Sequence, residues 1–190
     1  SDAYGHAAFG VDNYVWSTEQ NKYVSDGTIT VFGLFPINGY SSEQAKLDER
    51  VRGLFLIDPK VTLNELKKNK FYSGENTDPD GILRISSDYH TDQKTKEVLQ
   101  TEIESNKGYK GMSRNCSTFA REGVRNALGN NIKGEESFLG KTYVTPNRLF
   151  EDAKIFPNTE IVVDPGKKTN YKFSSTIKSA IKQEVKERIK

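Results

Sequence analysis

The strongest nucleophile among the side chains of this chain occurs once, at Cys116. From Cys116 to Leu128 the apolar residues recur with the spacing of one helical face, and Gly129 follows where helices commonly end. Asn115 is a good N-cap residue, so the pattern predicts that Cys116 is the first residue of a helix. Backbone N–H groups and the helix dipole favour a thiolate at that position. The alternative is a buried, unreactive cysteine.

A cysteine nucleophile needs a base, and the chain contains only two histidines, His6 and His90. Alternating apolar and small residues predict a strand over residues 5–12, which would contain His6. A strand histidine beside a cysteine at a helix N-terminus can accept the thiol proton and stabilise the thiolate. We therefore expect Cys116 and His6 to form a catalytic pair. The alternative for His6 is an ordinary hydrogen-bonded histidine.

The residue that would orient His6 is open to more than one interpretation. A second strand predicted over residues 13–19 carries Ser17 and Glu19 at the same parity, so either could flank His6 if the two strands form a hairpin. Glu19 would also stabilise the imidazolium. Asp12, at an expected turn, is a weaker candidate. The alternative is that Ser17 and Glu19 are ordinary surface residues of an edge strand.

Two residues near the expected nucleophile are candidates for substrate binding. Tyr109 lies seven residues before Cys116 and either lines the cleft or packs inside the protein. Asn115 is adjacent to the nucleophile. The backbone N–H of Cys116 is a candidate oxyanion donor, because helix N-terminal donors suit a developing negative charge.

Four segments together resemble the circularly permuted NlpC/P60 (papain-like) cysteine hydrolases, in which the histidine strand precedes the cysteine helix. They are residues 5–11 (GHAAFGV), 31–36 (VFGLFP), 115–120 (NCSTFA) and 145–149 (TPNRL). The resemblance covers about residues 1–150. It implies an α+β fold in which an antiparallel sheet packs against the nucleophile helix.

The same resemblance implies a function. Members of this group cleave amide bonds through a thioester without a cofactor, most often in peptidoglycan stem peptides. A secreted antibacterial effector domain, such as a type VI-like toxin acting in the bacterial periplasm or cell envelope, would fit. A cognate inhibitor or immunity protein would be its partner, and we expect a monomer. Alternatives are a lipid-directed amidase, thioesterase or acyltransferase, and an inactive binding or adaptor module of the same fold.

The amino-acid composition excludes some classes of protein. The 28 basic and 26 acidic residues give a net charge of +2, so the chain has no general affinity for nucleic acid or other polyanions. A single cysteine excludes an internal disulfide. The sequence contains neither an apolar run long enough to span a membrane nor a signal-peptide pattern.

The C-terminal tail differs in kind from the rest. Ile177, Ile181, Val185 and Ile189 recur every four residues among lysines, which predicts a basic amphipathic helix. We therefore divide the chain into a catalytic domain over residues 1–166 and a tail over 167–190. The tail is expected to pack on the domain or fray, rather than bind a membrane or a partner.

Two metal sites are weaker alternatives. Residues 76–81 (NTDPDG) resemble the start of a calcium loop, but Ser87 stands where the bidentate glutamate is needed, so a plain turn is favoured. His6, His90 and Cys116 lack the spacing of zinc ligands. We therefore expect no metal and no cofactor.

The remaining elements follow from hydrophobic periodicity and capping signals. Strands are also predicted over residues 28–35, 54–57 (ended by Asp58-Pro59), 82–85 and 160–163, helices over 41–52, 62–70, 91–105 and 146–153, and a loop over 130–141.

Overall fold

A computed structural model describes residues 6–38, 40–41, 44, 47–68, 79–138 and 140–166. The fold is a mixture of helices and strands, and its sheets are antiparallel. The predicted C-terminal helix and residues 76–78 of the calcium-like sequence lie outside the described residues. Among the described residues, no helix has the length and apolar character needed to cross a membrane.

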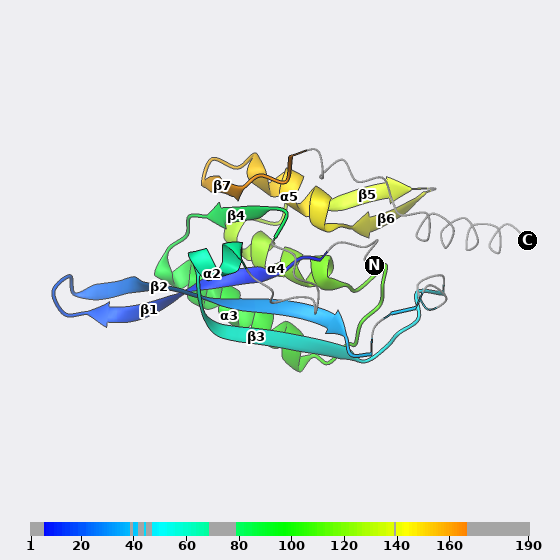
Figure 1. Cartoon of the computed structure of the whole chain (residues 1–190), viewed down its shortest axis with the longest axis horizontal. Coiled ribbons are helices and arrows are strands. Elements are labelled where there is room, and N and C mark those ends of the chain that lie inside the picture. The colour runs from blue at the N-terminus through cyan, green and yellow to red at the C-terminus, as the bar shows by residue number, and fades with distance from the viewer. Residues whose placement is uncertain are drawn as a thin grey trace, which may run out of the picture.

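The main sheet has the strand order β1-β2-β3, in which β1 is Phe9–Ser17, β2 is Lys22–Pro36 and β3 is Gly53–Thr62. All its strand pairs are antiparallel, with Phe9 opposite Phe32 and Phe32 opposite Ile57. Figure 1 shows that the β1–β2 hairpin extends beyond the rest of the molecule. The separate strand predicted over residues 13–19 is wrong, because β1 continues through Asn13 with only a local shift of register between Asp12 and Tyr14.

Strand β3 is longer than predicted. Asp58-Pro59 was expected to end it, yet the strand continues to Thr62. Proline is tolerated there because β3 is an edge strand and its register shifts at this point, so the missing N–H costs no ladder hydrogen bond.

Two helices pack side by side against the sheet: α3, Tyr89–Glu104, and α4, Cys116–Leu128. Their buried side chains meet those of β1 and β2 in one core, formed by Val11, Phe32, Leu34, Leu99 and Phe119. The predicted packing of the cysteine helix on an antiparallel sheet is therefore confirmed. The α3 prediction is also confirmed, although the helix begins two residues earlier, after the N-cap Asp88.

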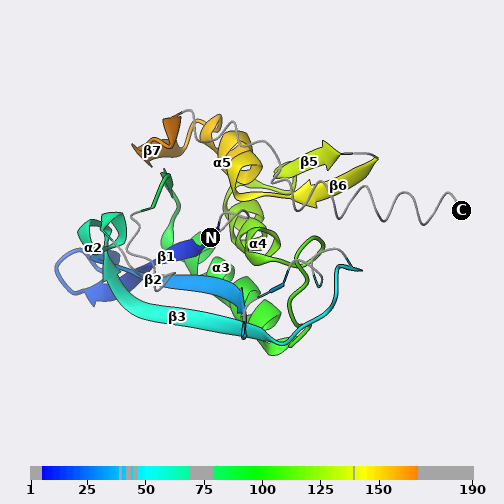
Figure 2. The ribbon, with the colours of Figure 1, turned by 45° about the vertical axis from the view of Figure 1, so that its right-hand side comes forward.

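A further layer covers the other side of α4 (Figures 1 and 2). It contains helix α5, Pro146–Lys154, the strand pair β4 (Ile82–Ile85) with β7 (Thr159–Val163), and the hairpin of β5 (Glu135–Phe138) with β6 (Lys141–Val144). A second core joins this layer to α4; its buried members are Ala120, Val124, Ile132, Leu149 and Ala153. The structure confirms α5, β4 and β7, whereas the loop expected over residues 130–141 contains part of the β5–β6 hairpin.

Two of the predicted capping signals are present in the structure. At Ser41 the backbone N–H donates to the Gln44 side chain, and the Gln44 N–H donates back to the Ser41 hydroxyl. The expected continuation to Arg52 is wrong, because Asp48 adopts a φ of 46° and residues 49–50 are not helical. Helix α2, Leu63–Lys67, begins after the capping box of Thr62 and Glu65.

Candidate active site

Local sequence signals place Cys116 at the start of α4, as predicted. The Asn115 side-chain oxygen accepts from the N–H groups of Ser117 and Thr118, at 2.9 and 3.0 Å. The Asn115 N–H donates to the Thr118 hydroxyl, which completes a capping box. At the other end Gly129 has a φ of 103°, which favours glycine. Asn115 is thus a structural cap, and its side chain is engaged within the protein.

The Asn115 amide also ties the start of α4 to two other segments. It donates to the carbonyl oxygens of Gly111, at 3.1 Å, and Val144, at 3.4 Å. The first belongs to the loop before α4, and the second ends β6. One side chain therefore fixes the position of Cys116 relative to its own loop and to the outer layer.

The thiol of Cys116 is enclosed, with only 6% of the residue exposed. The backbone of Ala7 hydrogen-bonds to its sulfur, and the Ser117 hydroxyl lies 3.9 Å from it. Burial raises the pKa of the Cys116 thiol, and this outweighs the hydrogen bonds from Ala7 and Ser117, which act to lower it. The expected preference for thiolate is therefore wrong for this state, because desolvation exceeds the effect of the helix terminus.

His6 lies just before β1 rather than inside a strand. Its ring stacks on Phe35 of β2, with ring centroids 4.2 Å apart and planes 17° from parallel. Continuing the β1–β2 register past Phe9 and Phe32 brings residue 6 opposite residue 35, so strand pairing explains this contact. His6 is consequently fixed at the sheet end that carries the α4 N-terminus, since the neighbouring Ala7 contacts the Cys116 sulfur.

Burial also changes the acidity of His6. It lowers the pKa of the imidazole from 6.5 to about 4, so the ring is neutral at neutral pH. With the thiol pKa raised, the resting pair is a neutral imidazole and a neutral thiol. The two groups therefore do not form an imidazolium–thiolate ion pair in this structure.

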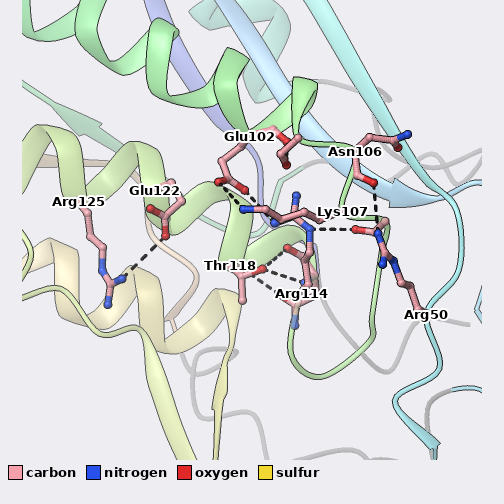
Figure 3. Close-up of polar contacts among 11 residues, drawn as sticks. Arg50, Glu102, Asn106, Lys107, Arg114, Thr118, Glu122 and Arg125 are labelled. Atoms are coloured by element: carbon pink, nitrogen blue, oxygen red, sulfur yellow. Dashed lines mark hydrogen bonds and ion pairs between the residues drawn. The ribbon is translucent and has the colours of Figure 1, made fainter.

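The loop that leads into α4 is held by polar contacts on both sides. Arg114 donates to Glu102 of α3, at 2.8 Å, and to the Gly108 carbonyl, at 3.0 Å (Figure 3). Asp48 accepts from the Met112 N–H, at 2.9 Å, and from the Ser113 hydroxyl, at 2.6 Å. These contacts fix the approach to Cys116 without using its thiol.

Tyr109 packs within the protein. It lies against the core that contains Phe119, and its ring meets Tyr40 edge-on, with centroids 5.3 Å apart. Its backbone pairs with Val51 in both directions, at 2.9 Å. Between the two alternatives left by the sequence, the structure favours packing over lining a cleft.

The structure does not bring Ser17 or Glu19 to His6. Ser17 ends β1 opposite Lys22, and Glu19 is exposed in the turn of the hairpin. A strand of this length separates them from His6 by roughly 30 Å. The expected flanking position is wrong because residues 13–17 continue the first strand instead of folding back along it.

Asp12 and His90 also belong to other surroundings. Asp12 lies inside β1, and burial together with Asp92 raises its pKa. His90 lies on exposed α3 surface, edge-on to Tyr89. Across the part of the chain that the structure describes, no three side chains of histidine, cysteine, aspartate or glutamate gather as a metal site.

Two contributors to the site were not singled out from the sequence. The Ala7 backbone gave no signal, because any residue supplies an N–H. Phe35 lay within a predicted strand, but its contact with His6 depends on the pairing register. Comparisons with known protein families, curated proteins and solved structures gave no match. The functional argument therefore depends on the arrangement of residues at this site.

Proposed function

We propose that this protein is a cysteine hydrolase of the permuted NlpC/P60-like (papain-like) type, which cleaves an amide bond. Cys116 is the nucleophile and His6 the base. One observation carries the proposal: the segment that holds His6 runs along the start of α4, so that the Ala7 backbone reaches the Cys116 sulfur. This contact joins residues 109 positions apart in sequence at a helix N-terminus, where nucleophilic cysteines are commonly found, and His6 is the residue before Ala7.

The mechanism begins from the neutral pair. As the Cys116 sulfur attacks the carbonyl carbon, its proton passes to His6, and the carbonyl oxygen gains negative charge beside the Cys116 N–H. The carbon–nitrogen bond then breaks, and His6 returns the proton to the departing amine. Water attacks the resulting thioester with His6 as base, releasing a carboxylic acid and restoring the thiol.

The resemblance of residues 5–11 and 115–120 to that group supports peptidoglycan stem peptides as the substrate. A delivered antibacterial effector acting in the cell envelope, opposed by an immunity protein, is the corresponding biological setting. A lipid acyl group is the alternative substrate, since related permuted proteins act on acyl compounds.

One observation favours a second candidate, an adaptor module of the same architecture without chemistry. The Cys116 thiol is enclosed and its pKa is raised, which is typical of an unreactive cysteine. In a hydrolase the enclosing segments must open to admit substrate, whereas in an adaptor they need not.

Alkylation of the only cysteine separates the two candidates. We expect the rate of Cys116 alkylation by iodoacetamide to rise with pH through a single alkaline step, because burial raises the thiol pKa. In a hydrolase, a substrate-derived electrophile such as a peptidyl acyloxymethyl ketone should label Cys116 much faster than iodoacetamide at pH 7, and His6→Ala should remove that advantage. Equal, slow labelling by both reagents would favour the adaptor.

The substrate class is tested directly. Purified sacculi and total bacterial lipids are incubated with the wild type, with Cys116→Ala and with the control His90→Ala, and the products are identified by mass spectrometry. New amines and carboxylates from sacculi only, absent with Cys116→Ala, are expected. If products form from lipids only, a lipid acyl group is the substrate instead of peptidoglycan. If neither preparation yields a product, the proposed hydrolase activity is contradicted.

A further inference from the structure

The far end of the main sheet is a two-stranded hairpin that the third strand does not reach. Strand β3 pairs with β2 only from Thr28 onward, so residues Tyr14–Ser17 of β1 and Lys22–Ser25 of β2 extend beyond it. Figure 1 shows this hairpin projecting from the body, at the end opposite the start of α4. One face of the hairpin is held by α3, because Tyr23 stacks on Tyr89 with ring centroids 4.2 Å apart and the Tyr14 hydroxyl donates to Asp92. Among the described residues no strand lies beside the outer edge of β1, and a hairpin of two strands gains stability from a third.

The hairpin exposes apolar side chains on both of its faces. Trp16 and Tyr23 form a cross-strand pair and are 51% and 44% exposed. Val15 is 50% exposed and lies on the opposite face, across from Val24. A third strand added to the hairpin would cover parts of both faces at once, whereas a partner on one face would leave the other exposed.

The two edges of the main sheet differ in their protection against such pairing. On β3, the sequence Asp58-Pro59-Lys60 supplies a proline and two charges, and Pro59 and Lys60 together oppose the single residue Thr30 in a bulge. These are devices that prevent edge-to-edge association. On β1, residues 13–18 contain neither charge nor proline. Within the described part of the chain, β1 pairs only with β2.

We infer that the outer edge of β1 is a self-association surface, on which a second copy of this chain adds its own β1 antiparallel about a twofold axis near Val15 and Trp16. A twofold axis places the strand against itself, so like charges must not fall opposite one another. With the axis through Val15, the nearest charged residues, Asp12 and Glu19, face Thr18 and Val11 of the other copy. The strand is therefore compatible in charge with itself.

This interface is independent of the proposed hydrolase. The hairpin lies roughly 30 Å from His6 along β1, so dimerisation through it should not change the surroundings of Cys116. It replaces the monomer expected from the sequence. Trp16 is the only tryptophan of the chain, so its fluorescence reports directly on the contact.

Sedimentation velocity and tryptophan emission over a dilution series test the association. We expect the wild type to dimerise with rising concentration while the emission of Trp16 shifts to shorter wavelength. Val15→Lys places a charge at the pairing edge and should weaken the dimer by roughly tenfold or more. Ile155→Lys, at a 77% exposed site near the end of α5, is the matched control and should leave the dimer unchanged. A wild type that stays monomeric, or a dimer indifferent to Val15→Lys, would overturn the inference.

Cross-linking locates the axis. In a Cys116→Ala background, which has no other cysteine, Val15→Cys, Trp16→Cys and Ser17→Cys are each oxidised and compared with Ile155→Cys. Directly opposed residues of antiparallel strands lie close enough for a disulfide. We expect rapid covalent dimers at one of the three β1 positions. Cross-linking no faster than at Ile155→Cys would contradict strand pairing, and circular dichroism confirms that each variant is folded.

Discussion

Helices α3 and α4 lie side by side on the same sheet, yet the buried groups at their N-termini are held by different kinds of partner. Each begins with a side-chain cap, Asp88 in α3 and Asn115 in α4. Each places a buried ionisable residue in the first turn or just after it, Asp92 in α3 and Cys116 in α4. The difference between them lies in how the buried group is partnered.

Asp92 has donors on both of its oxygens. The Tyr14 hydroxyl donates to Oδ2 at 2.6 Å, and the Ser87 hydroxyl donates to Oδ1. This network joins α3 to β1 and to the segment after β4. Burial, together with the bond to Asp92, raises the pKa of Tyr14, so the phenol stays protonated as a donor. A carboxylate whose acceptors are satisfied in this way holds elements together.

Cys116 is partnered in the opposite manner. Its sulfur contacts the backbone N–H of Ala7 and the hydroxyl of Ser117. His6 is the residue before Ala7. None of these contacts connects strands that would otherwise separate. The comparison teaches that burial alone says little about the role of a group: Asp92 is held by side-chain donors from two other segments, whereas Cys116 meets only a backbone N–H and the hydroxyl of the next residue.

Exchanging the two groups for alanine gives the largest expected effect. Asp92→Ala leaves the half-buried Tyr14 hydroxyl and the exposed Ser87 hydroxyl without their acceptor and should lower the free energy of unfolding by about 1–3 kcal/mol. Cys116→Ala should reduce turnover of the substrate by roughly a thousandfold or more. Urea unfolding and an assay of amide cleavage are measured on both variants.

Each substitution should affect one property and spare the other. Asp92→Ala is expected to keep its activity per folded molecule, and Cys116→Ala to change stability by no more than about 1 kcal/mol, because a small buried thiol is replaced by a smaller apolar group. Loss of activity in folded Asp92→Ala would place the α3 network in the site and remove the distinction.

The pH dependence of stability sharpens the comparison at His6. Because burial holds the pKa of the folded imidazole at about 4, the unfolded chain binds a proton below pH 6.5 that the folded chain does not. Stability from this group is complete above pH 6.5 and falls as the pH drops toward 4, by up to about 3 kcal/mol.

Urea unfolding of wild type and His6→Gln between pH 4 and pH 8 measures the effect. The difference between the two curves isolates His6, because acidic groups such as Asp12 titrate equally in both. His90→Gln, at an exposed histidine, should follow the wild type. A wild-type curve parallel to that of His6→Gln would show that His6 is accessible to protons in the folded state.

What the sequence revealed about α4 was local, and it was confirmed. Asn115, the helical spacing and Gly129 each act within a few residues of one another, so their effects do not depend on the rest of the fold. The same holds for the capping box of Thr62 and Glu65.

The errors concern the strands, whose limits depend on distant partners. Nothing near Asn13 shows that β1 runs through it, and nothing near Pro59 shows that β3 is an edge strand with a bulge. Both facts follow from the pairing of β2 with its neighbours. Because a separate strand is predicted over residues 13–19, Ser17 and Glu19 are wrongly placed beside His6.

At the candidate site, the position of Cys116 at the start of a helix could be predicted from the sequence, and the acidity of Cys116 and His6 could not. The helix terminus acts on Cys116 whatever surrounds it, but burial is produced by segments that converge from across the chain. The balance between the helix terminus and burial sets the direction of the pKa shift of Cys116, and burial is known only from the assembled structure.

The contact between Gly123 and Phe9 tests how the His6 segment is held on α4. A Cβ at residue 123 would lie 2.7 Å from the Phe9 ring, so Gly123→Ala must displace that ring. Overpacking costs about 1–3 kcal/mol, partly offset by the better helix propensity of alanine, so a net loss of about 1 kcal/mol is expected.

Because Phe9 follows His6 by three residues, the same substitution should also lower turnover several-fold. Adding Phe9→Leu to Gly123→Ala provides room and should restore both quantities in a double-mutant cycle. Activity unchanged in Gly123→Ala alone would show that the position of His6 does not depend on this contact.

The smallest effect is expected at the hairpin residues that the sequence favoured as orienting groups. Ser17 accepts from the Gln20 N–H within the turn, and Glu19 is exposed beside it. Ser17→Ala and Glu19→Gln should therefore leave turnover within about twofold of the wild type and stability within about 0.5 kcal/mol, as for other surface substitutions. Steady-state kinetics measured at fixed protein concentration tests this, with His6→Ala as the variant that must lose activity. A large loss of turnover in Glu19→Gln would require the hairpin to approach the site in the working protein, and the separation between the two ends of the sheet would no longer hold.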